Sequence, residues 1–205
     1  MTRILLVEDN PKHLADAKTL LEERVRSGVI GGVDYASTLR QAMESLRTGD
    51  YTGMLLDVFF PNDEGETEQP NCVKVDEYAL DKGMPFVLVT STYHHGRKTE
   101  PVSKWAREKH MELVDRFPKT SEEEEAPTKE WEGAYLALAY LIEGKNSGEI
   151  TITSEGLSRG KNILALACNM EYERGTGDLK AKLERGINTD PILKRAIQKY
   201  CQGMW

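Results

Sequence analysis

Three acidic residues lie where short apolar runs end. The run Ile4–Val7 leads into Glu8 and Asp9, and the run Met54–Leu56 leads into Asp57. Short apolar runs bounded by polar residues are typical of strands buried on both faces of a parallel sheet. Because parallel strands end at the same edge of a sheet, we expect the three carboxylates to lie close together.

Carboxylates packed closely raise one another's pKa unless a cation holds them. Hard oxygen ligands of this kind suit Mg²⁺, which binds through one or two carboxylates, water and a phosphate. The cluster therefore predicts a divalent-metal site with phosphoryl chemistry beside it. Acidic strand ends can also be simply solvated, but three acids that end two strands, followed by a threonine that ends a later one, favour a site.

Apolar runs and helical spacings alternate five times along the first two thirds of the chain. Asn10-Pro11 marks a helix start, Ser37 is a candidate cap for the second helix, and Thr128 for the last one. We expect strands at about 4–7, 33–36, 54–59, 86–89 and 112–117, and helices at about 11–27, 38–48, 73–81, 102–110 and 129–143.

This alternation predicts an α/β fold, a parallel sheet with helices on both faces and right-handed crossovers. In such sheets, ligands bind beyond the carboxyl ends of the strands, where the strand order reverses. Thr90 follows the run Phe86–Val89 and would join the three acids at that edge.

Three motifs resemble the receiver domain of two-component response regulators: LLVEDN from Leu5, LLDVFFP from Leu55 and VLVTS from Val87. The resemblance covers about residues 1–143. It implies a flavodoxin-like (βα)5 doubly wound sheet, in which a central aspartate takes a phosphoryl group from a histidine kinase in a Mg²⁺-dependent reaction.

The resemblance also implies roles for single residues. Asp57 would accept the phosphoryl group, and Thr90 would be the switch hydroxyl. Mg²⁺ would be held by Glu8, Asp9, Asp57 and the backbone carbonyl of Phe59. In chemical terms, a carboxylate acts as nucleophile while the cation and nearby donors neutralise the phosphoryl oxygens.

The family's conserved lysine is harder to place. The family has Lys-Pro after the fifth strand, whereas this chain has the proline first, in Phe117-Pro118-Lys119-Thr120. Lys119 is the expected lysine, with a local backbone that differs from the family's, and Phe117 is the candidate for the switch aromatic. The loop after Asp57, residues 62–71, is long and acidic, so the partner-facing surface should be atypical.

The remaining residues no longer alternate between strand and helix patterns, so a domain boundary is expected near 145–148. It would separate a receiver domain, 1–144, from a mainly helical extension or small output domain, 145–205. A short strand is expected at 150–153, and helices at about 157–173, 178–185 and after Asp190-Pro191. The last helix would carry on one face Arg195, Gln198, Lys199 and Gln202, which suits a helix-turn-helix that binds DNA.

Charge limits that DNA-binding hypothesis. The net charge is −7 overall, but −10 over residues 1–144 and only +3 over residues 145–205. The acidic part is a poor nucleic-acid surface, so an extension that packs on the receiver, forms a homodimer or docks another protein is favoured.

The location of the protein follows from two further features. The apolar runs are too short for a membrane span, and the three cysteines are widely spaced. We therefore expect a cytoplasmic protein with reduced thiols.

These observations lead to a leading hypothesis and three alternatives. The first is a phosphorelay switch, not a turnover enzyme, which phosphorylates and slowly dephosphorylates only itself; its partners would be a histidine kinase or phosphotransfer protein and a downstream protein. The alternatives are a DNA-binding regulator, a receiver-like module that is not phosphorylated, and a metal-dependent phosphohydrolase. The last lacks the usual Asp-x-Asp, because Val58 and Phe59 follow Asp57.

Overall fold

The structure is a computed structural model of the chain, and it describes residues 2–90, 104, 113–114, 129, 131–153, 155–157 and 189–202. The strands are β1 Arg3–Val7, β2 Gly32–Ala36, β3 Gly53–Asp57, β4 Phe86–Val89 and β5 Leu113–Val114. The helices are α1 Pro11–Arg26, α2 Leu39–Thr48, α3 Cys72–Asp81, α6 Trp131–Asn146 and α9 Pro191–Tyr200.

The five strands form one parallel sheet in the order β2-β1-β3-β4-β5. This is the doubly wound order of flavodoxin-like folds, in which the strand order reverses between β1 and β3. The register pairs Val7 of β1 with Leu56 of β3, and Asp57 with Val89 of β4. The predicted fold class is confirmed by this order and register.

The middle of the sheet is fully buried, which explains its unbroken apolar runs. Leu5, Leu6, Leu55 and Leu56 have no exposed surface. Gly53 opens β3 directly beneath α6: a Cβ there would lie 2.9 Å from Leu138 Cδ1, so the helix approaches the sheet closely at this point. Burial on both faces requires helices on each side of the sheet.

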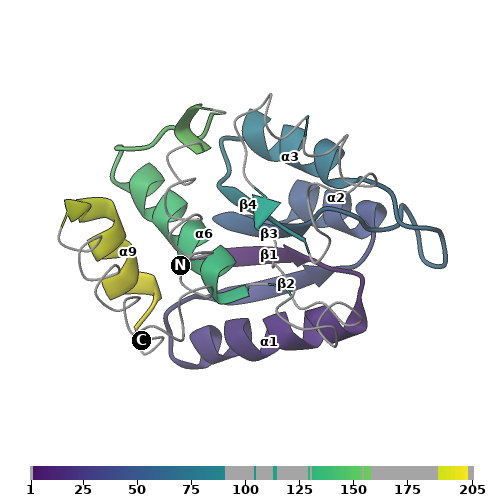
Figure 1. Ribbon diagram of the computed structural model, residues 1–205, viewed down its shortest axis with the longest axis horizontal. Helices are drawn as coiled ribbons and strands as arrows, with labels where there is room; N and C mark the ends of the chain where they lie inside the picture. Colours follow the sequence, from purple (N-terminus) through teal and green to yellow (C-terminus); the bar gives the residue numbers. More distant parts are fainter. Residues whose placement is uncertain are drawn as a thin grey trace.

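Helices cover both faces (Figure 1): α1 and α6 contact each other on one face, and α2 and α3 contact each other on the other. The start of α1 is fixed by Asn10, whose Oδ1 accepts hydrogen bonds from the backbone N–H groups of Lys12 (3.0 Å) and His13 (3.4 Å). None of the helices in the described residues is long and apolar enough to cross a membrane.

The predicted cap of α2 was wrong by one residue. Thr38, not Ser37, is the N-cap, and its hydroxyl oxygen accepts a hydrogen bond from the Gln41 backbone N–H at 3.2 Å. Ser37 instead donates from its backbone N–H and its hydroxyl to Gln41 Oε1, at 2.9 and 3.0 Å. The side chain three residues into the helix thus reaches back to the chain that enters it, much as in a capping box.

The C-terminal helix α9 packs against α6, on the side of α6 away from the sheet (Figure 1). Its apolar face is buried and consists of Ile192, Leu193, Ala196 and Tyr200. Since α6 is buried without interruption from Gly133 to Gly144, it is apolar nearly all round rather than amphipathic. The long apolar run of α6 is therefore explained by two partners, the sheet on one side and α9 on the other.

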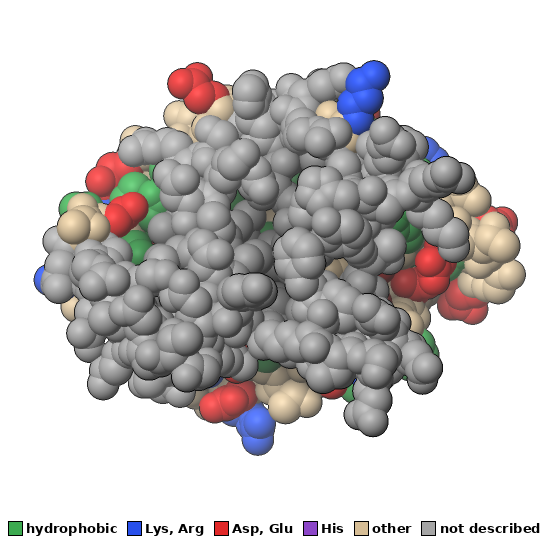
Figure 2. All heavy atoms as spheres, viewed as in Figure 1, with side chains coloured by type: hydrophobic (Ala, Val, Ile, Leu, Met, Phe, Trp, Pro, Cys, Tyr) green, Lys and Arg blue, Asp and Glu red, His purple; other side chains and the backbone are tan. Residues whose placement is uncertain are grey.

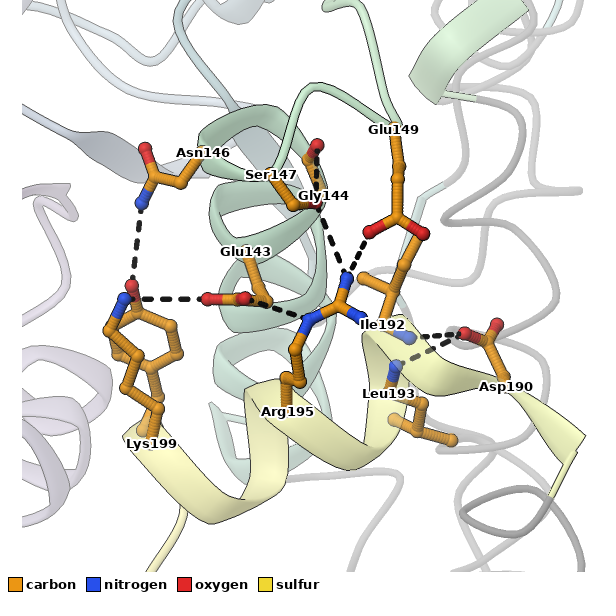
Figure 3. Close-up of polar contacts among 11 residues, drawn as sticks. Glu143, Gly144, Asn146, Ser147, Glu149, Asp190, Ile192, Leu193, Arg195 and Lys199 are labelled. Atoms are coloured by element: carbon orange, nitrogen blue, oxygen red, sulfur yellow. Dashed lines mark hydrogen bonds and ion pairs between the residues drawn. The ribbon is translucent and has the colours of Figure 1, made fainter.

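Polar contacts fix α9 along the length of α6. Tyr135 Oη donates to the Tyr200 carbonyl at 2.9 Å, and Tyr140 Oη to Asp190 Oδ2 at 3.0 Å. At the far end of α6, shown in Figure 3, Glu143 binds Arg195 Nε at 3.0 Å and Lys199 Nζ at 3.4 Å.

Several predicted boundaries change. The third strand was expected at 54–59 but ends at Asp57, because the chain bends at Val58. The last receiver helix was expected to end at Gly144 but continues to Asn146. The strand expected at 150–153 is absent there; the segment makes a bend, with Ile150 and Ile152 buried. The helices expected at 102–110, 157–173 and 178–185 lie largely outside the described residues.

Candidate metal centre

The fold brings the three predicted carboxylates together. Glu8 and Asp9 directly follow β1, Asp57 is the last residue of β3, and the pairing of Val7 with Leu56 places Glu8 beside Asp57. Each acid offers one oxygen, and these three oxygens lie within 4.8 Å of one another. Glu8 and Asp57 are buried, while Asp9 is half-buried.

A lysine that the sequence did not predict completes the cluster. Lys129 Nζ lies 2.6 Å from Glu8 Oε2 and 2.6 Å from Asp57 Oδ1. Its side chain is 2% exposed, so the ammonium is held inside the protein by two carboxylates. The Trp131 ring, in the first turn of α6, lies 5.7 Å from the same Nζ. Lys129 therefore connects the acidic pair to the start of α6.

Lys119 and Phe117, the residues predicted for the lysine and the switch aromatic, lie outside the described residues. Lys129 was missed because the prediction followed the family's Lys-Pro pairing, which points to Pro118-Lys119. Only a weak signal was present in the sequence. Lys129 stands two residues before Trp131, where the apolar helix begins, and a lysine needs an acidic partner only if it is buried there.

Burial dominates the electrostatics of the site. Burial, together with the neighbouring Asp57, raises the pKa of Glu8 to about 8, against the opposing effect of Lys129. Burial likewise raises the pKa of Asp57, and burial with the charge of Asp57 raises the pKa of Asp9 to about 6. Burial alone would lower the pKa of Lys129, but the two carboxylates outweigh it and raise that pKa. One ammonium is therefore too little positive charge to keep all three acids ionised near neutral pH.

The hydrogen bonds of each carboxylate show which oxygens are engaged. Glu8 Oε1 accepts from the Asn10 backbone N–H at 3.1 Å, and Glu8 Oε2 binds Lys129. Asp57 Oδ1 accepts from the Val58 backbone N–H at 2.7 Å and also binds Lys129. Among the described residues, both of these contacts to Asp57 fall on Oδ1 rather than on Oδ2.

The donor set fits Mg²⁺. Two ligands of one Mg²⁺ lie at most about 4.2 Å apart, given ligand distances of 2.0–2.1 Å. The three carboxylate oxygens, within 4.8 Å of one another, need only small rotations to meet that limit. Asp9 and Asp57 are best placed as direct ligands, because Glu8 already uses both oxygens and would act mainly by holding Lys129 and by binding cation-bound water.

Thr90 and Phe59 lie at the same edge of the sheet. Thr90 follows β4 directly, one residue beyond the pairing of Asp57 with Val89, and is 2% exposed. Phe59 lies two residues past the end of β3 and is half-buried. The structure therefore brings Glu8, Asp9 and Asp57 together and adds Lys129, while Thr90 and Phe59 follow the ends of the neighbouring strands.

No protein-family model matches this sequence, and no curated protein matches it. Several solved structures resemble it. The bacteriophytochrome response regulator AtBRR is 22% identical, with 56% of this chain and 81% of that chain covered and a TM-score of 0.41. The MaeR response regulator bound to beryllium trifluoride is 21% identical, with 61% and 92% covered and a TM-score of 0.38.

The RcsB response regulator of Salmonella typhimurium is 14% identical over 99% of this chain and 90% of that chain, with a TM-score of 0.43. With TM-scores below 0.5, these likenesses add nothing to the fold assignment, which rests on the strand order and register.

Proposed function

We propose that this chain is a phosphoacceptor switch of the response-regulator kind, in which Asp57 takes a phosphoryl group from a histidine kinase or phosphotransfer protein. One observation carries the proposal: a buried ammonium, Lys129 Nζ, bridges two carboxylates at 2.6 Å each, beside a third acid, at the carboxyl edge of a parallel sheet. Phosphoryl transfer needs such positioned charges more than it needs covalent chemistry from the protein.

In the proposed reaction, Asp57 Oδ2 attacks the phosphorus atom of the donor. The bond from phosphorus to the donor's leaving atom breaks, and an acyl phosphate forms on Asp57. Mg²⁺, when bound by Asp9 and Asp57, would neutralise charge between the carboxylate and the phosphoryl oxygens. The Lys129 ammonium, already in contact with Asp57, would hydrogen-bond one phosphoryl oxygen.

Hydrolysis would reverse the modification. Water attacks the acyl phosphate, releases inorganic phosphate and restores the Asp57 carboxylate. The chain would therefore act only on itself, as a switch with a finite lifetime. Thr90, buried at the end of the neighbouring strand, is the hydroxyl proposed to respond to the new phosphoryl oxygens.

Output through the chain's own C-terminal helix is favoured by its packing. Lys129 stands two residues before α6, and α9 is fixed to α6 at Tyr135, Tyr140 and Glu143. A displacement of Lys129 toward a phosphoryl group would be passed to this helix pair. A downstream protein partner could read the same displacement on the surface that α6 and α9 share.

The DNA-binding alternative gains no support from α9. The basic face expected there is partly neutralised, because Glu143 binds both Arg195 and Lys199, and Glu149 also binds Arg195 (Figure 3). The Gln202 backbone is engaged too, since Arg24 Nη1 donates to its carbonyl. A helix whose cations are paired with acids of its own chain is poorly suited to phosphate contacts.

Phosphorylation is tested by incubating the protein with MgCl₂ and acetyl phosphate, followed by intact-mass analysis and mapping of the adduct. We expect one phosphoryl group on Asp57, none in Asp57→Asn, and unchanged labelling in Asp81→Asn, which removes an exposed acid elsewhere. The proposed function would be ruled out if neither acetyl phosphate nor a phosphorylated histidine kinase modified the wild type. It would also be ruled out if the adduct persisted in Asp57→Asn.

A further inference from the structure

Trp131 lies beside the Lys129 ammonium, at the point where α6 begins. The centre of its ring is 5.7 Å from Lys129 Nζ, which is within the range of a cation–π contact. The same Nζ is 2.6 Å from Asp57 Oδ1, so the two distances place the ring centre no more than about 8 Å from that oxygen. Trp131 therefore belongs to the immediate surroundings of the Asp57 carboxylate.

Trp131 is also buried. It is 5% exposed, and the side chain of its neighbour Lys129 is 2% exposed. On the face shown in Figure 2, the described hydrophobic side chains reach the surface only in small separate areas, so an enclosed aromatic ring fits the rest of the molecule. A polar atom on a buried ring is shielded from bulk water and needs a partner inside the protein.

The polar atom of Trp131 has no such partner. Within the described part of the chain, Nε1 is buried and makes no hydrogen bond. An indole N–H can only donate, and a buried donor without an acceptor costs free energy. A donor of this kind is explained if a bound group supplies the acceptor.

A phosphoryl group on Asp57 would supply acceptors in this place. It would bring three oxygens, each of which is a strong hydrogen-bond acceptor. Lys129 can donate three hydrogen bonds, of which two already go to Glu8 and Asp57. One ammonium therefore leaves phosphoryl oxygens for other groups to bind, and the indole N–H is a buried donor beside it.

We propose that Trp131 is a further phosphoryl-binding residue: in the phosphorylated protein, its indole N–H donates a hydrogen bond to a phosphoryl oxygen on Asp57. Its ring keeps contact with the Lys129 ammonium, so one side chain contacts both the phosphoryl group and the lysine that binds it. Because Trp131 opens α6, the hydrogen bond would also connect the modified Asp57 to the helix on which α9 packs. This role rests on the proposed function, since it needs the phosphoryl group.

The hydrogen bond is tested directly by ¹H–¹⁵N NMR of the tryptophan indole groups in the full chain. The chain has three tryptophans, so the signal of Trp131 is identified by replacing each of them with Phe in turn. When an excess of acetyl phosphate is added in the presence of MgCl₂, we expect this signal to move downfield, because the N–H gains a short hydrogen bond to a charged acceptor. The same addition to Asp57→Asn should leave the signal in place.

The rate of phosphorylation provides a second readout. Trp131→Phe keeps an aromatic ring but removes the donor, and we expect it to react about 10-fold or more slowly than the wild type, since a hydrogen bond to a charged group is lost. Tyr78→Phe is the matched control. It removes a donor from another ring, the hydroxyl that binds the Leu46 carbonyl at 3.3 Å, and its rate should stay near that of the wild type.

Two results would overturn the role of Trp131. One is an unmoved Trp131 signal in wild-type protein that mass spectrometry shows to be phosphorylated, and the other is a wild-type rate in a folded Trp131→Phe. If circular dichroism shows that Trp131→Phe does not fold, the NMR result on the wild type decides alone. An unmodified wild type would instead contradict the proposed function itself, so the two failures are distinguishable.

Discussion

Lys129 is the residue on which the chemistry of the site depends most. Its ammonium is the only cation of the described residues that contacts both Glu8 and Asp57, and both contacts are 2.6 Å. Without it, two buried carboxylates would face each other, and at least one would take up a proton. A protonated carboxyl is a poor nucleophile, so in the proposed function Lys129 would oppose the protonation of Asp57 and would also bind the incoming phosphoryl group.

Lys129→Met and Lys119→Met distinguish the lysine in the structure from the one the sequence suggested. We expect Lys129→Met to slow phosphorylation of Asp57 by acetyl phosphate about 100-fold or more, since removal of one positioned donor costs that much in comparable sites. Lys119→Met should phosphorylate at nearly the wild-type rate. The rates are measured by mass spectrometry over time, and the opposite ranking would return the role to Lys119.

At this scale, the sequence allowed the acids to be predicted but not the lysine. Glu8, Asp9 and Asp57 are fixed by the strand that each follows, and strand ends can be read from apolar runs. Lys129 comes after a segment without strand or helix periodicity, so neither its distance from the fifth strand nor its direction could be deduced. The prediction therefore relied on the family's Lys-Pro pair, which pointed to Lys119.

At the scale of elements, the sequence favoured an extension that packs on the first domain, forms a homodimer or docks another protein, but it did not indicate that α9 packs on α6. The apolar positions of α9 follow helical spacing, so the helix itself was predicted, starting at Asp190-Pro191 as the structure shows. The position where α9 packs could not be predicted, because an amphipathic pattern shows which face of a helix is buried but not which element covers it. The only signal was in α6, whose apolar residues exceed what one face against a sheet requires.

Leu193→Ala tests how much the α6–α9 contact contributes to stability. Leu193 is 1% exposed, and its truncation leaves a cavity, so we expect a loss of about 2–5 kcal/mol in the free energy of unfolding. Lys194→Ala, a neighbouring exposed position, should change that free energy by less than about 0.5 kcal/mol. Urea unfolding followed by circular dichroism measures both, and equal small losses would show that α9 contributes little to the folded state.

At the scale of the whole molecule, the metal centre makes stability depend on pH. Folding raises the pKa of Glu8 from 4.5 to about 8 and that of Asp9 from 3.8 to about 6. Between these limits the folded state holds more protons than the unfolded state, so stability falls as pH rises from about 4.5 toward 8. Divalent cations, which bind the ionised carboxylates, should offset that loss.

Melting temperatures with and without MgCl₂ check this linkage. We expect Mg²⁺ to raise the Tm clearly at pH 8 and hardly at pH 5, where Glu8 and Asp9 are largely protonated. In Glu8→Gln, the fall in Tm between pH 5 and pH 8 without Mg²⁺ should be smaller than in the wild type. A Mg²⁺ effect of equal size at both pH values would contradict the assignment of these acids to the cation.

The hydrogen bond from Arg24 to the carbonyl of Gln202 joins positions 178 residues apart and ties the end of the chain to its first helix. During synthesis, the parallel sheet can assemble once α6 has left the ribosome, but the face of α6 that α9 covers has to wait for residues 191–200. At 5–20 residues per second, that interval lasts roughly 3 to 11 seconds. We expect a nascent chain whose apolar helix stays uncovered for so long to be bound by chaperones that act on emerging polypeptides.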